Sequence, residues 1–502
     1  MEINWKKLQN GSDIRGVAME GIAGENANLT TEVVETLGKA FAFWLKDKYE
    51  GNISVAIGMD SRLSGPSLKK AFSDGLVEQS VNVVDCGLAS TPAMFMATLS
   101  SKIKVEAGVM LTASHLPFNR NGLKFFTNKG GLEKNDISEI LEIASSVTFK
   151  NQNKVGIINN YDLISEYSQI LVQKIRASVN HPNFDKPLEG LKIIVDAGNG
   201  SGGFFAHQVL VPLGANIEGS QFLDPDGSFP NHIPNPEDSK AMESICQAVK
   251  QSNADFGIIF DTDVDRSAVV DQNGNAINRN TLIALISAII LDEHPGTSIV
   301  TDSITSEGLS WFIKDKLKGT HHRFKRGYKN VINEAIRLNN ENKPSWIAIE
   351  TSGHAALKEN YFLDDGAYLV AKLLVKLAQL KLKNLQLTDL IKDLPQPLES
   401  EEYRLSIKIP EFAKYGQSVI EKITKLVGST SNWQAEPNNY EGIRVKCLNK
   451  DEKGWFLVRM SLHDPIIPIN IESDVIGGAK TIKGKLKNML VGFGDLDLSA
   501  IG

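Results

Sequence analysis

The segment SVAIGMDSRLSG, residues 54–65, shows the local pattern that decides the fold. A short apolar, β-branched run leads into a loop of Gly, Asp and Ser, and the amphipathic stretch SLKKAFSDGLVEQ follows it. The same order returns in KIIVDAGNGSG (192–202) and in TSIVTDSITSEG (297–308), which continues into EGLSWFIKDKLKG. Strands that alternate with helices predict parallel strands covered by helices. We therefore expect three α/β domains in tandem.

The last hundred residues have a different pattern. Two close prolines and an acidic run in IKDLPQPLESEEYRLSIKIP indicate a linker. Beyond it, GIRVKC, GWFLVRMS and IPINIES are typical of strands, which predicts a smaller α+β domain. The expected fold is three tandem α/β/α domains with mixed sheets and a C-terminal α+β domain. We expect their bounds at 1–158, 159–278, 279–392 and 393–502.

Composition excludes several classes of protein. The chain has 502 residues, of which 42% are hydrophobic and 23% charged, as in an ordinary globular protein. A net charge of −6 gives no basic footprint for nucleic acid. No apolar run approaches the roughly 18 residues of a membrane helix, and the N-terminus lacks the apolar core of a secretion signal. We expect a cytoplasmic protein. The three cysteines, Cys86, Cys246 and Cys447, lie far apart and predict neither disulfides nor a zinc site.

A polar loop follows the apolar run that ends in LTASHLPFNRNGLKFF (111–126). Ser114 stands beside His115, and Lys124 follows ten residues after the serine. Open α/β sheets bind their ligands in loops at the carboxyl ends of strands. From these residues alone, Ser114 is either a nucleophile or a turn residue, and both interpretations stay open.

The stretch DFGIIFDTDVDRSAVVD contains three aspartates in alternation, Asp261, Asp263 and Asp265, followed by Arg266. Alternate side chains of an extended loop point the same way, so these carboxylates repel one another unless a cation lies between them. Oxygen ligands favour magnesium or calcium. The competing interpretation is a solvated acidic turn. Because apolar runs flank the loop on both sides, we predict a metal site.

Two further strand-to-loop junctions carry polar groups. WIAIETSGHAAL (346–357) presents Glu350, Ser352 and His354, which suit a hydroxyl-rich ligand, although Glu350 also suits a helix cap. WFLVRMSLHDP (455–465) presents Arg459, Ser461 and His463. Arginine with hydroxyls is a phosphate-binding combination, and the alternative is a surface arginine before a turn.

One motif indicates another class of enzyme. IIVDAGNGSGG contains Gly198, Gly200 and Gly203 in the G-x-G-x-x-G order after a strand, and Glu218 follows about 20 residues later. This pattern is the dinucleotide-binding fingerprint. Against it, Asp196 precedes the first glycine, where a carboxylate would repel a bound pyrophosphate.

Taken in order, these motifs resemble the α-D-phosphohexomutase superfamily, especially its phosphomannomutase/phosphoglucomutase branch. The resemblance spans nearly the whole chain and rests on several motifs in the same order. They are SDIRG (12–16), GMDSRLSG (58–65), TASH with the following NG and Lys124, PDGSFPNHIPNPE (225–237), DTDVDR (261–266), RGYKN (326–330), ETSGH (350–354) and GWFLVRMS (454–461).

The resemblance implies a magnesium-dependent mutase that interconverts hexose 1-phosphate and hexose 6-phosphate through a bisphosphate intermediate, in a central cleft between four domains. Ser114 would be carried as phosphoserine and would contribute a metal ligand, with Arg15, His115 and Lys124 as further catalytic residues. The remaining assignments are Asp261, Asp263 and Asp265 to Mg²⁺, and Arg266, Lys329, Glu350, Ser352, His354, Arg459, Ser461 and His463 to the substrate. Hexose 1,6-bisphosphate would be the activator. Expected partners are hexose phosphates, with no nucleic acid or membrane, and the protein would be a monomer or homodimer.

The sequence departs from its relatives in the final loop. Relatives read R-x-S-[GN]-T-[EQT]-P, whereas Leu462 and His463 occupy the Gly/Asn and Thr positions here and Asp464 precedes the proline. Leu116 replaces an asparagine beside the serine, and Ser12 stands where the branch often has tyrosine. Two alternatives therefore stay open: a non-catalytic sugar-phosphate-binding protein and a phosphotransferase that forms a sugar bisphosphate. ETSGH favours a branch that accepts both glucose and mannose phosphates.

Overall fold

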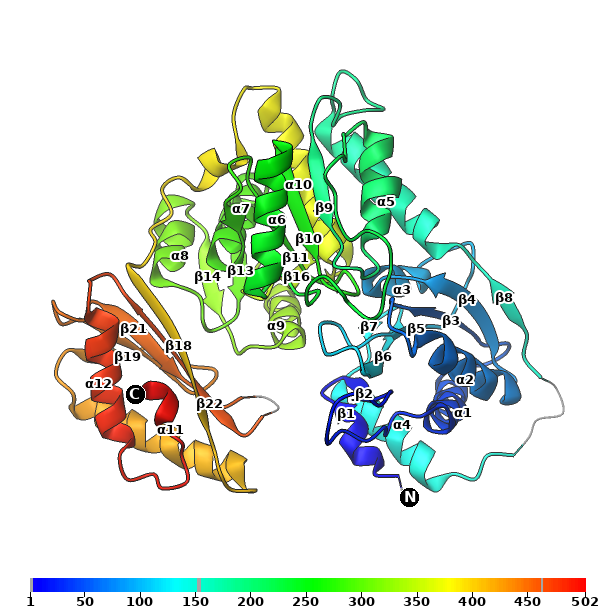
Figure 1. Ribbon diagram of the computed structural model, residues 1–502, viewed down its shortest axis with the longest axis horizontal. Coiled ribbons are helices and arrows are strands. Elements are labelled where there is room, and N and C mark those ends of the chain that lie inside the picture. Colours follow the sequence, from blue (N-terminus) through cyan, green and yellow to red (C-terminus); the bar gives the residue numbers. More distant parts are fainter. Residues whose placement is uncertain (1–2, 151–154, 462–463) are drawn as a thin grey trace. The chain divides into compact units, whose positions relative to one another are not determined.

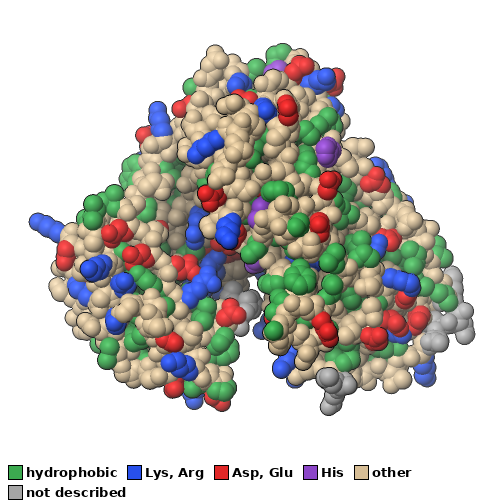
Figure 2. Space-filling model, in the orientation of Figure 1, with side chains coloured by type: hydrophobic (Ala, Val, Ile, Leu, Met, Phe, Trp, Pro, Cys, Tyr) green, Lys and Arg blue, Asp and Glu red, His purple; other side chains and the backbone are tan. Residues whose placement is uncertain are grey.

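The computed structural model describes residues 3–150, 155–461 and 464–502. The chain forms two compact units, which Figure 1 shows in ribbon form. Unit 1 comprises Met1–Asn278 and Ser352–Leu387, and unit 2 comprises Arg279–Thr351 and Thr388–Gly502. Among the described residues, no helix combines the length and the apolar composition needed to cross a bilayer. On the face drawn in Figure 2, acidic and basic side chains are interspersed over each unit.

The first sheet of unit 1 is mixed, with the strand order β1-β2-β6-β5-β3-β4-β8, and β7 pairs with β6. Strands β5, β3 and β4 run parallel, and β6 returns antiparallel beside β5. Helices α1, α2 and α4 share one apolar core with the sheet. The elements are η1 (Trp5–Leu8), β1 (Gln9–Asn10), β2 (Asp13–Val17), α1 (Thr31–Lys48), β3 (Ser54–Met59), α2 (Gly65–Glu78), β4 (Asn82–Leu88), α3 (Thr91–Ala97), β5 (Ala107–Leu111), β6 (Arg120–Thr127), β7 (Gly130–Gly131), α4 (Lys134–Ser146) and β8 (Ile158–Asn160).

Helix α3 packs against the same sheet at glycines of β3 and β5. A Cβ atom at Gly108 would lie 2.4 Å from the carbonyl oxygen of Met94, and one at Gly58 would lie 2.6 Å from Met94 Sδ. These positions therefore require glycine for the helix to approach. The predicted domain boundary at residue 158 falls on the first residue of β8, which pairs with β4 in this sheet.

The second sheet of unit 1 has the order β12-β11-β10-β9. Strands β9 and β10 are parallel, and β10 and β11 form an antiparallel hairpin whose connection carries the three aspartates. Helix α6 closes one apolar core, and α5 packs beside α10. The elements are α5 (Leu163–Val179), β9 (Ile193–Asp196), the π-helix η2 (Phe205–Leu210), η3 (Val211–Leu213), α6 (Ser239–Ser252), β10 (Phe256–Phe260), β11 (Ser267–Val270) and β12 (Ala276–Ile277). Unit 1 also contains β16 (Ala355–Leu357), η5 (Lys358–Asn360), β17 (Leu363–Asp364) and α10 (Gly366–Lys381); β16 and β17 pair antiparallel with each other and are not part of this four-stranded sheet.

Unit 2 begins with a third α/β arrangement, in which β13 pairs parallel with both β14 and β15. Its elements are α7 (Arg279–Glu293), β13 (Ser298–Thr301), α8 (Glu307–Trp311), η4 (Phe312–Lys316), β14 (Thr320–Arg323), α9 (Tyr328–Asn340) and β15 (Ser345–Ile349). Helix α7 is apolar on all sides and buries ten of its fifteen residues, as expected for a helix packed within a core.

The predicted C-terminal α+β domain is an antiparallel sheet with the order β18-β22-β21-β20-β19. Helices α11 and α12 share its apolar core. Its elements are β18 (Glu399–Ser406), α11 (Phe412–Ser429), β19 (Trp433–Ala435), β20 (Ile443–Cys447), β21 (Gly454–Val458), β22 (Ile466–Ser473), α12 (Gly478–Leu490) and η7 (Ser499–Ile501), after the linker turn η6 (Leu387–Ile391). The expected fold class, three α/β/α arrangements followed by a smaller β-rich domain, is confirmed.

Candidate active site

Ser114 lies in the loop after β5 with a backbone conformation that is unusual for serine. Its φ is +50°, in the left-handed region that residues other than glycine rarely adopt. The Ser114 N–H donates to Oγ1 of Thr112 (2.9 Å), and Ser114 Oγ donates to Oδ2 of Asp261 (2.9 Å). The side chain is buried. Strained residues that their surroundings hold in place cluster at functional sites, so this geometry favours a chemical role over a simple turn.

The three aspartates fill the connection between β10 and β11. Asp261, Asp263 and Asp265 are all buried, and a carboxylate oxygen of each lies within 4.8 Å of the others. Burial, with the negative charge of Asp265, raises the pKa of Asp261 well above its usual range. Burial opposes ionisation of Asp265 too, but the charge of Lys124 holds the pKa of Asp265 below its usual range. The cluster therefore depends on nearby positive charge.

Lys124 supplies part of that charge from β6. It stands opposite Met110 of β5, so the antiparallel return brings it back to the loop that follows β5. Its Nζ lies 3.3 Å from Oδ2 of Asp263 and forms an ion pair with Oδ2 of Asp265. The structure thus brings Lys124 to the aspartates.

Arg266 connects two loops: the β5–β6 connection that holds Ser114 (112–119, the serine loop) and the β10–β11 connection that holds the three aspartates (261–266, the aspartate loop). Its Nε and Nη2 donate to Oδ2 of Asp261 (3.1 and 3.0 Å), and Nη2 also donates to Oγ of Ser114 (2.9 Å) and to Nδ1 of His115 (2.7 Å). Its Nη1 donates to Oδ1 of Asn235 (3.1 Å). Because a guanidinium only donates, Nδ1 of His115 accepts. Burial and the neighbouring Arg266 charge lower the pKa of His115 to about 2, so this imidazole is neutral.

The donor set of the aspartate loop fits a hard divalent cation. Oδ1 of Asp263 and Oδ1 of Asp265 are buried and accept no hydrogen bond within the described part of the chain. Buried carboxylate oxygens are costly without a partner. Three carboxylates that supply oxygen ligands alone match the preference of Mg²⁺. Asp261, Asp263 and Asp265 are therefore suited to hold it.

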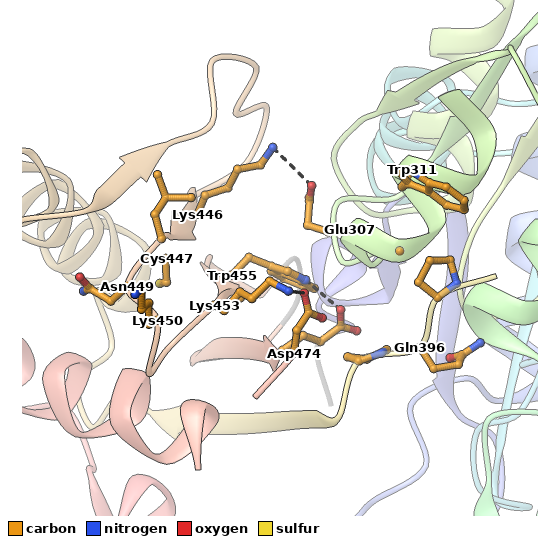
Figure 3. Close-up of a pocket in the computed structure, with 16 residues that line it drawn as sticks. Glu307, Trp311, Gln396, Lys446, Cys447, Asn449, Lys450, Lys453, Trp455 and Asp474 are labelled. Carbon is orange, nitrogen blue, oxygen red and sulfur yellow. Dashed lines mark hydrogen bonds and ion pairs between the residues drawn. The ribbon is translucent and has the colours of Figure 1, made fainter. Parts of the chain in front are cut away.

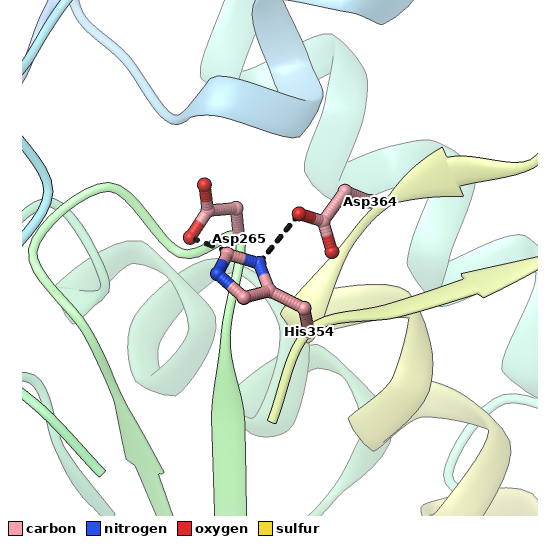
Figure 4. A group of neighbouring side chains, drawn as sticks. All are labelled: Asp265, His354 and Asp364. Carbon is pink, nitrogen blue, oxygen red and sulfur yellow. Dashed lines mark hydrogen bonds and ion pairs between the residues drawn. The ribbon is translucent and has the colours of Figure 1, made fainter. Parts of the chain in front are cut away.

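A second group of titratable side chains adjoins this loop (Figure 4). His354 Nδ1 lies 2.5 Å from Oδ2 of Asp364 and 3.9 Å from Oδ1 of Asp265. Burial alone would lower the pKa of His354, but the charges of Asp364 and Asp265 raise it to about 9. The imidazolium of His354 thus adds a third cation beside the aspartates, after Lys124 and Arg266, and Asp364 orients it.

Arg15, another predicted catalytic residue, lies on β2. It stands opposite Gly122 of β6, where a Cβ atom would lie 2.3 Å from the carbonyl oxygen of Ile14. Its Nη2 forms an ion pair with Oδ2 of Asp13 (3.0 Å), and its side chain is 18% exposed. Arg15 is thus more accessible to a ligand than the buried side chains of the predicted serine and lysine. Ser352, also in unit 1, is buried.

Other predicted substrate residues belong to unit 2. Oε1 of Glu350 accepts the N–H of Gly327 (2.7 Å), which precedes α9, so this carboxylate caps a helix as one of the two sequence interpretations held. Lys329 lies in the first turn of α9 and is half-buried. Glu350 and Lys329 therefore both lie at the N-terminal end of α9.

Arg459 and Ser461 follow β21 in the final loop. Arg459 is buried, its Nη1 donates to the carbonyl of Met460 (3.2 Å), and its Nε has no hydrogen-bond partner among the described residues. Oγ of Ser461 accepts the N–H of Asp464 (3.2 Å). His463 lies outside the described residues. A buried guanidinium with an unused donor is suited to an anion.

The glycine motif at 198–203 has a packing explanation. A Cβ atom at Gly200 would lie 2.6 Å from the carbonyl oxygen of Thr262 in the aspartate loop, and one at Gly203 would lie 2.2 Å from that of Leu223. Asp196 accepts hydrogen bonds from the N–H of Gly198 and from Gln221. The loop is filled by its own chain, which removes the space that a dinucleotide needs.

Two functional contributions were not predicted from the sequence. Arg62, with its partner Asp60, donates hydrogen bonds to the serine loop, and Asp364 pairs with His354. Charged residues directly after a buried strand were a usable signal for Asp60 and Arg62. Asp364 gave no such signal, because its role arises only where β17 brings it beside His354.

Unit 2 also holds a cavity of about 610 Å³ between α8, residues 395–397 and the β20–β21 turn (Figure 3). Trp311 and Trp455 line it, and Glu472 accepts a hydrogen bond from Nε1 of Trp455 (2.8 Å). Burial raises the pKa of Glu472 to about 7. Among the described residues, the lining includes no predicted site residue.

Comparison with known families and proteins gives consistent matches. Models of phosphoglucomutase/phosphomannomutase α/β/α domains I, II and III match residues 6–151, 166–274 and 278–398. A phosphoglucomutase of Neisseria meningitidis is 30% identical over 481 residues, covering 94% of this chain and 95% of the relative. A phosphomannomutase/phosphoglucomutase of Pseudomonas syringae pv. tomato is 30% identical over 474 residues, covering 94% and 92%.

The fold is likewise similar to a solved structure. A phosphoglucomutase/phosphomannomutase family protein from Burkholderia thailandensis superposes with a TM-score of 0.77 at 26% identity, and the match covers 96% of each chain.

Proposed function

Because this chain belongs to the phosphoglucomutase/phosphomannomutase family and is a phosphohexomutase, we propose that it interconverts the 1- and 6-phosphates of glucose and mannose through phosphoserine 114. The observation that carries the proposal is the buried Ser114 Oγ, which meets both Asp261 and Arg266. The serine would give its phosphoryl group to a sugar monophosphate and receive the other one back from the resulting bisphosphate. Atoms and charge balance over the cycle, because each transfer to the sugar is matched by one back to Ser114.

Phosphoryl transfer needs positioning and charge neutralisation more than covalent help from the protein. A phosphoserine carries about −1.5 to −2 charge. Arg266, Lys124 and the imidazolium of His354 all lie at the aspartate loop, which supports their role as the fixed positive charges that balance it. Bound Mg²⁺, held by Asp261, Asp263 and Asp265, would add Lewis-acid stabilisation of the phosphoryl oxygens.

Proton transfer requires a group near the sugar hydroxyl. His115 is neutral with Nδ1 accepting from Arg266, so it is suited to orientation rather than to donation through that atom. Arg15 is partly exposed and already carries a charge, which suits binding of a substrate oxygen. We assign proton handling to Lys124, whose position is fixed by its ion pairs with Asp263 and Asp265, and we keep His354 as a charged contact to the substrate.

The remaining substrate contacts are assigned to Lys329, Glu350, Ser352, Arg459, Ser461 and, from the sequence alone, His463. The unused donor of Arg459 supports a phosphate contact. We also propose hexose 1,6-bisphosphate as the activator, a cytoplasmic location, a monomer or homodimer, and the four domain bounds expected from the sequence.

The test is a coupled assay with glucose 1-phosphate and with mannose 1-phosphate, each with and without hexose 1,6-bisphosphate. The proposal expects turnover of both sugars, stimulated by the bisphosphate and abolished by a chelator of divalent cations. Binding of either sugar phosphate without turnover would instead identify a sugar-phosphate-binding protein. Accumulation of the bisphosphate without the isomerised monophosphate would identify a phosphotransferase.

A further inference from the structure

Arg62 makes an unusual set of hydrogen bonds with the serine loop. Its Nη1 donates to the carbonyl oxygens of Pro117 (2.7 Å) and Arg120 (3.0 Å). Its Nη2 donates to the carbonyl oxygens of Leu116 (2.7 Å) and Ser114. The residue is 1% exposed, so all four bonds are made out of water. One side chain therefore fixes both sides of the turn between β5 and β6.

The bond to the Ser114 carbonyl acts on the strained residue itself. A non-glycine residue with φ of +50° persists only where the surroundings hold it in place. The N–H of Ser114 is bound by Thr112, its carbonyl by Arg62 and its Oγ by Asp261. With both adjoining peptide groups held, the direction of the Cα–Cβ bond is fixed, and with it the starting point of any phosphoryl group on Oγ.

Arg62 is in turn held in place by its neighbours. Its own N–H donates to Oδ1 of Asp60 (2.9 Å), and its Nε lies 3.3 Å from Oδ2 of the same carboxylate. Segment 225–237 covers the other side: the Phe229 ring centroid lies 5.3 Å from Cζ of Arg62. A Cβ atom at Gly227 would lie 2.4 Å from the Leu63 nitrogen, so this segment packs directly on the Arg62 loop.

We propose that Arg62 is the positioning residue that aligns phosphoserine 114 for transfer. It meets no reacting atom and acts through the backbone of the serine loop. The inference rests on the proposed function for its kinetic consequence, but not for its structural one. Lysine cannot replace it, because an ammonium has three donors on one atom, whereas a guanidinium spreads five donors over a plane.

The decisive variant is Arg62→Lys, which keeps the positive charge but loses the planar set of guanidinium donors. Misplacement of a reacting group by about 1 Å costs on the order of 100-fold. We expect kcat to fall about 100-fold while KM for hexose phosphate stays within about threefold, because Arg62 contacts no substrate group. Amide hydrogen exchange in peptides that cover 112–121 should rise at least about tenfold. In Arg62→Ala, added guanidinium ion should restore part of kcat.

Arg444→Lys is the matched control. Arg444 is equally buried and donates to the carbonyl oxygens of Ser303 (3.0 Å) and Thr305 (3.0 Å), but it lies in unit 2. It should lower the melting temperature to a similar degree and leave hydrogen exchange of 112–121 unchanged. This comparison separates alignment of the serine loop from a general loss of stability.

The outcomes separate the two proposals. If the wild-type protein shows no turnover, the proposed function fails, and the exchange data still decide whether Arg62 holds the loop. If the wild-type protein turns over and Arg62→Lys keeps its kcat and its exchange pattern, Arg62 is not a positioning residue. A loss of activity that only follows the unfolded fraction also overturns the inference. Should Arg62→Lys not fold, Phe229→Leu loosens the cover and must raise exchange in the same peptides.

Discussion

The serine loop of unit 1 and the Arg459 loop of unit 2 both follow a buried strand, yet they differ in how their charges are satisfied. In the serine loop, the chain itself supplies partners for Ser114, Arg266 and Arg62. In the Arg459 loop, the guanidinium is buried and donates from Nη1 to the carbonyl of Met460, and its Nε, like that of Arg62, has no hydrogen-bond partner among the described residues. Burial also lowers the pKa of Arg459. The proposed chemical loop is therefore held by many hydrogen bonds of its own chain, and the proposed phosphate loop leaves more donor capacity for a ligand.

The largest expected effect concerns Ser114. If the serine loop is the chemical centre, Ser114→Ala removes the group that carries the phosphoryl, and turnover should fall by at least about 10⁴-fold. Intact-mass measurement of the wild-type protein should show one added phosphoryl group that the variant lacks. Ser168→Ala, on α5, removes another buried hydroxyl and should keep full activity. Phosphate mapped consistently to a different serine would show that the loop holding Ser114 is not the chemical centre.

Asp263→Asn tests the acidic half of the same centre. The substitution preserves volume and the acceptor for Thr91 but removes one charge from the cluster. Because a Lewis acid contributes several kcal/mol to charge stabilisation, we expect turnover to fall about 10³-fold or more. The melting temperature should remain close to that of the wild-type protein. Full turnover of this variant in the presence of chelator would show that the aspartates hold no catalytic metal.

The same contrast explains what could be predicted from the sequence. The aspartate loop and Ser114 could be proposed as site residues because each is a contiguous motif at the end of an apolar strand. The β5–β6 return then brings Lys124 to them, as a hairpin requires. Arg62 was not recognised, because its acceptors lie more than fifty residues away and are carbonyl groups, which every residue possesses. Glu350 was ambiguous because a carboxylate that caps α9 and one that binds a sugar share the same local sequence.

The parts of the fold that could be predicted are likewise those marked by a contiguous local pattern. Strand-to-loop-to-helix order identified β3, β9 and β13 and their α/β surroundings. The boundary at 158 stays a prediction, and it falls on β8, a three-residue strand that joins β4 at the edge of the first sheet. Short edge strands carry too few apolar residues to show a periodic pattern.

Arg459→Ala tests whether the loop after β21 in unit 2 binds a substrate phosphate. A charge-assisted contact between arginine and phosphate contributes about 1.5–3 kcal/mol, so kcat/KM should fall about 10- to 150-fold. Phosphate on Ser114 should remain, since the serine loop is complete without Arg459. Arg404→Ala removes an exposed arginine of the same unit and should change neither quantity. A variant with unchanged kcat/KM would mean that the unused donor of Arg459 binds no substrate phosphate.

The smallest effect concerns stability and separates the two units by pH. Glu472 of unit 2 is buried against Trp455, and its pKa is raised from 4.5 to about 7. The folded protein therefore binds this proton more tightly than the unfolded chain does. The associated stability is fully present below about pH 4.5 and is lost as pH rises through about 7.

Glu472→Gln keeps an acceptor for Nε1 of Trp455 without the titrating charge. It should stabilise unit 2 by about 1–2 kcal/mol at pH 8, which raises its melting temperature by a few degrees, and by almost nothing at pH 5. Asp474→Asn, an exposed carboxylate of the same cavity, is the control and should show no such pH dependence. Calorimetry of both variants at the two pH values decides the matter: equal shifts at pH 5 and pH 8 would show that Glu472 is ionised throughout, and that the cavity of unit 2 tolerates a buried charge.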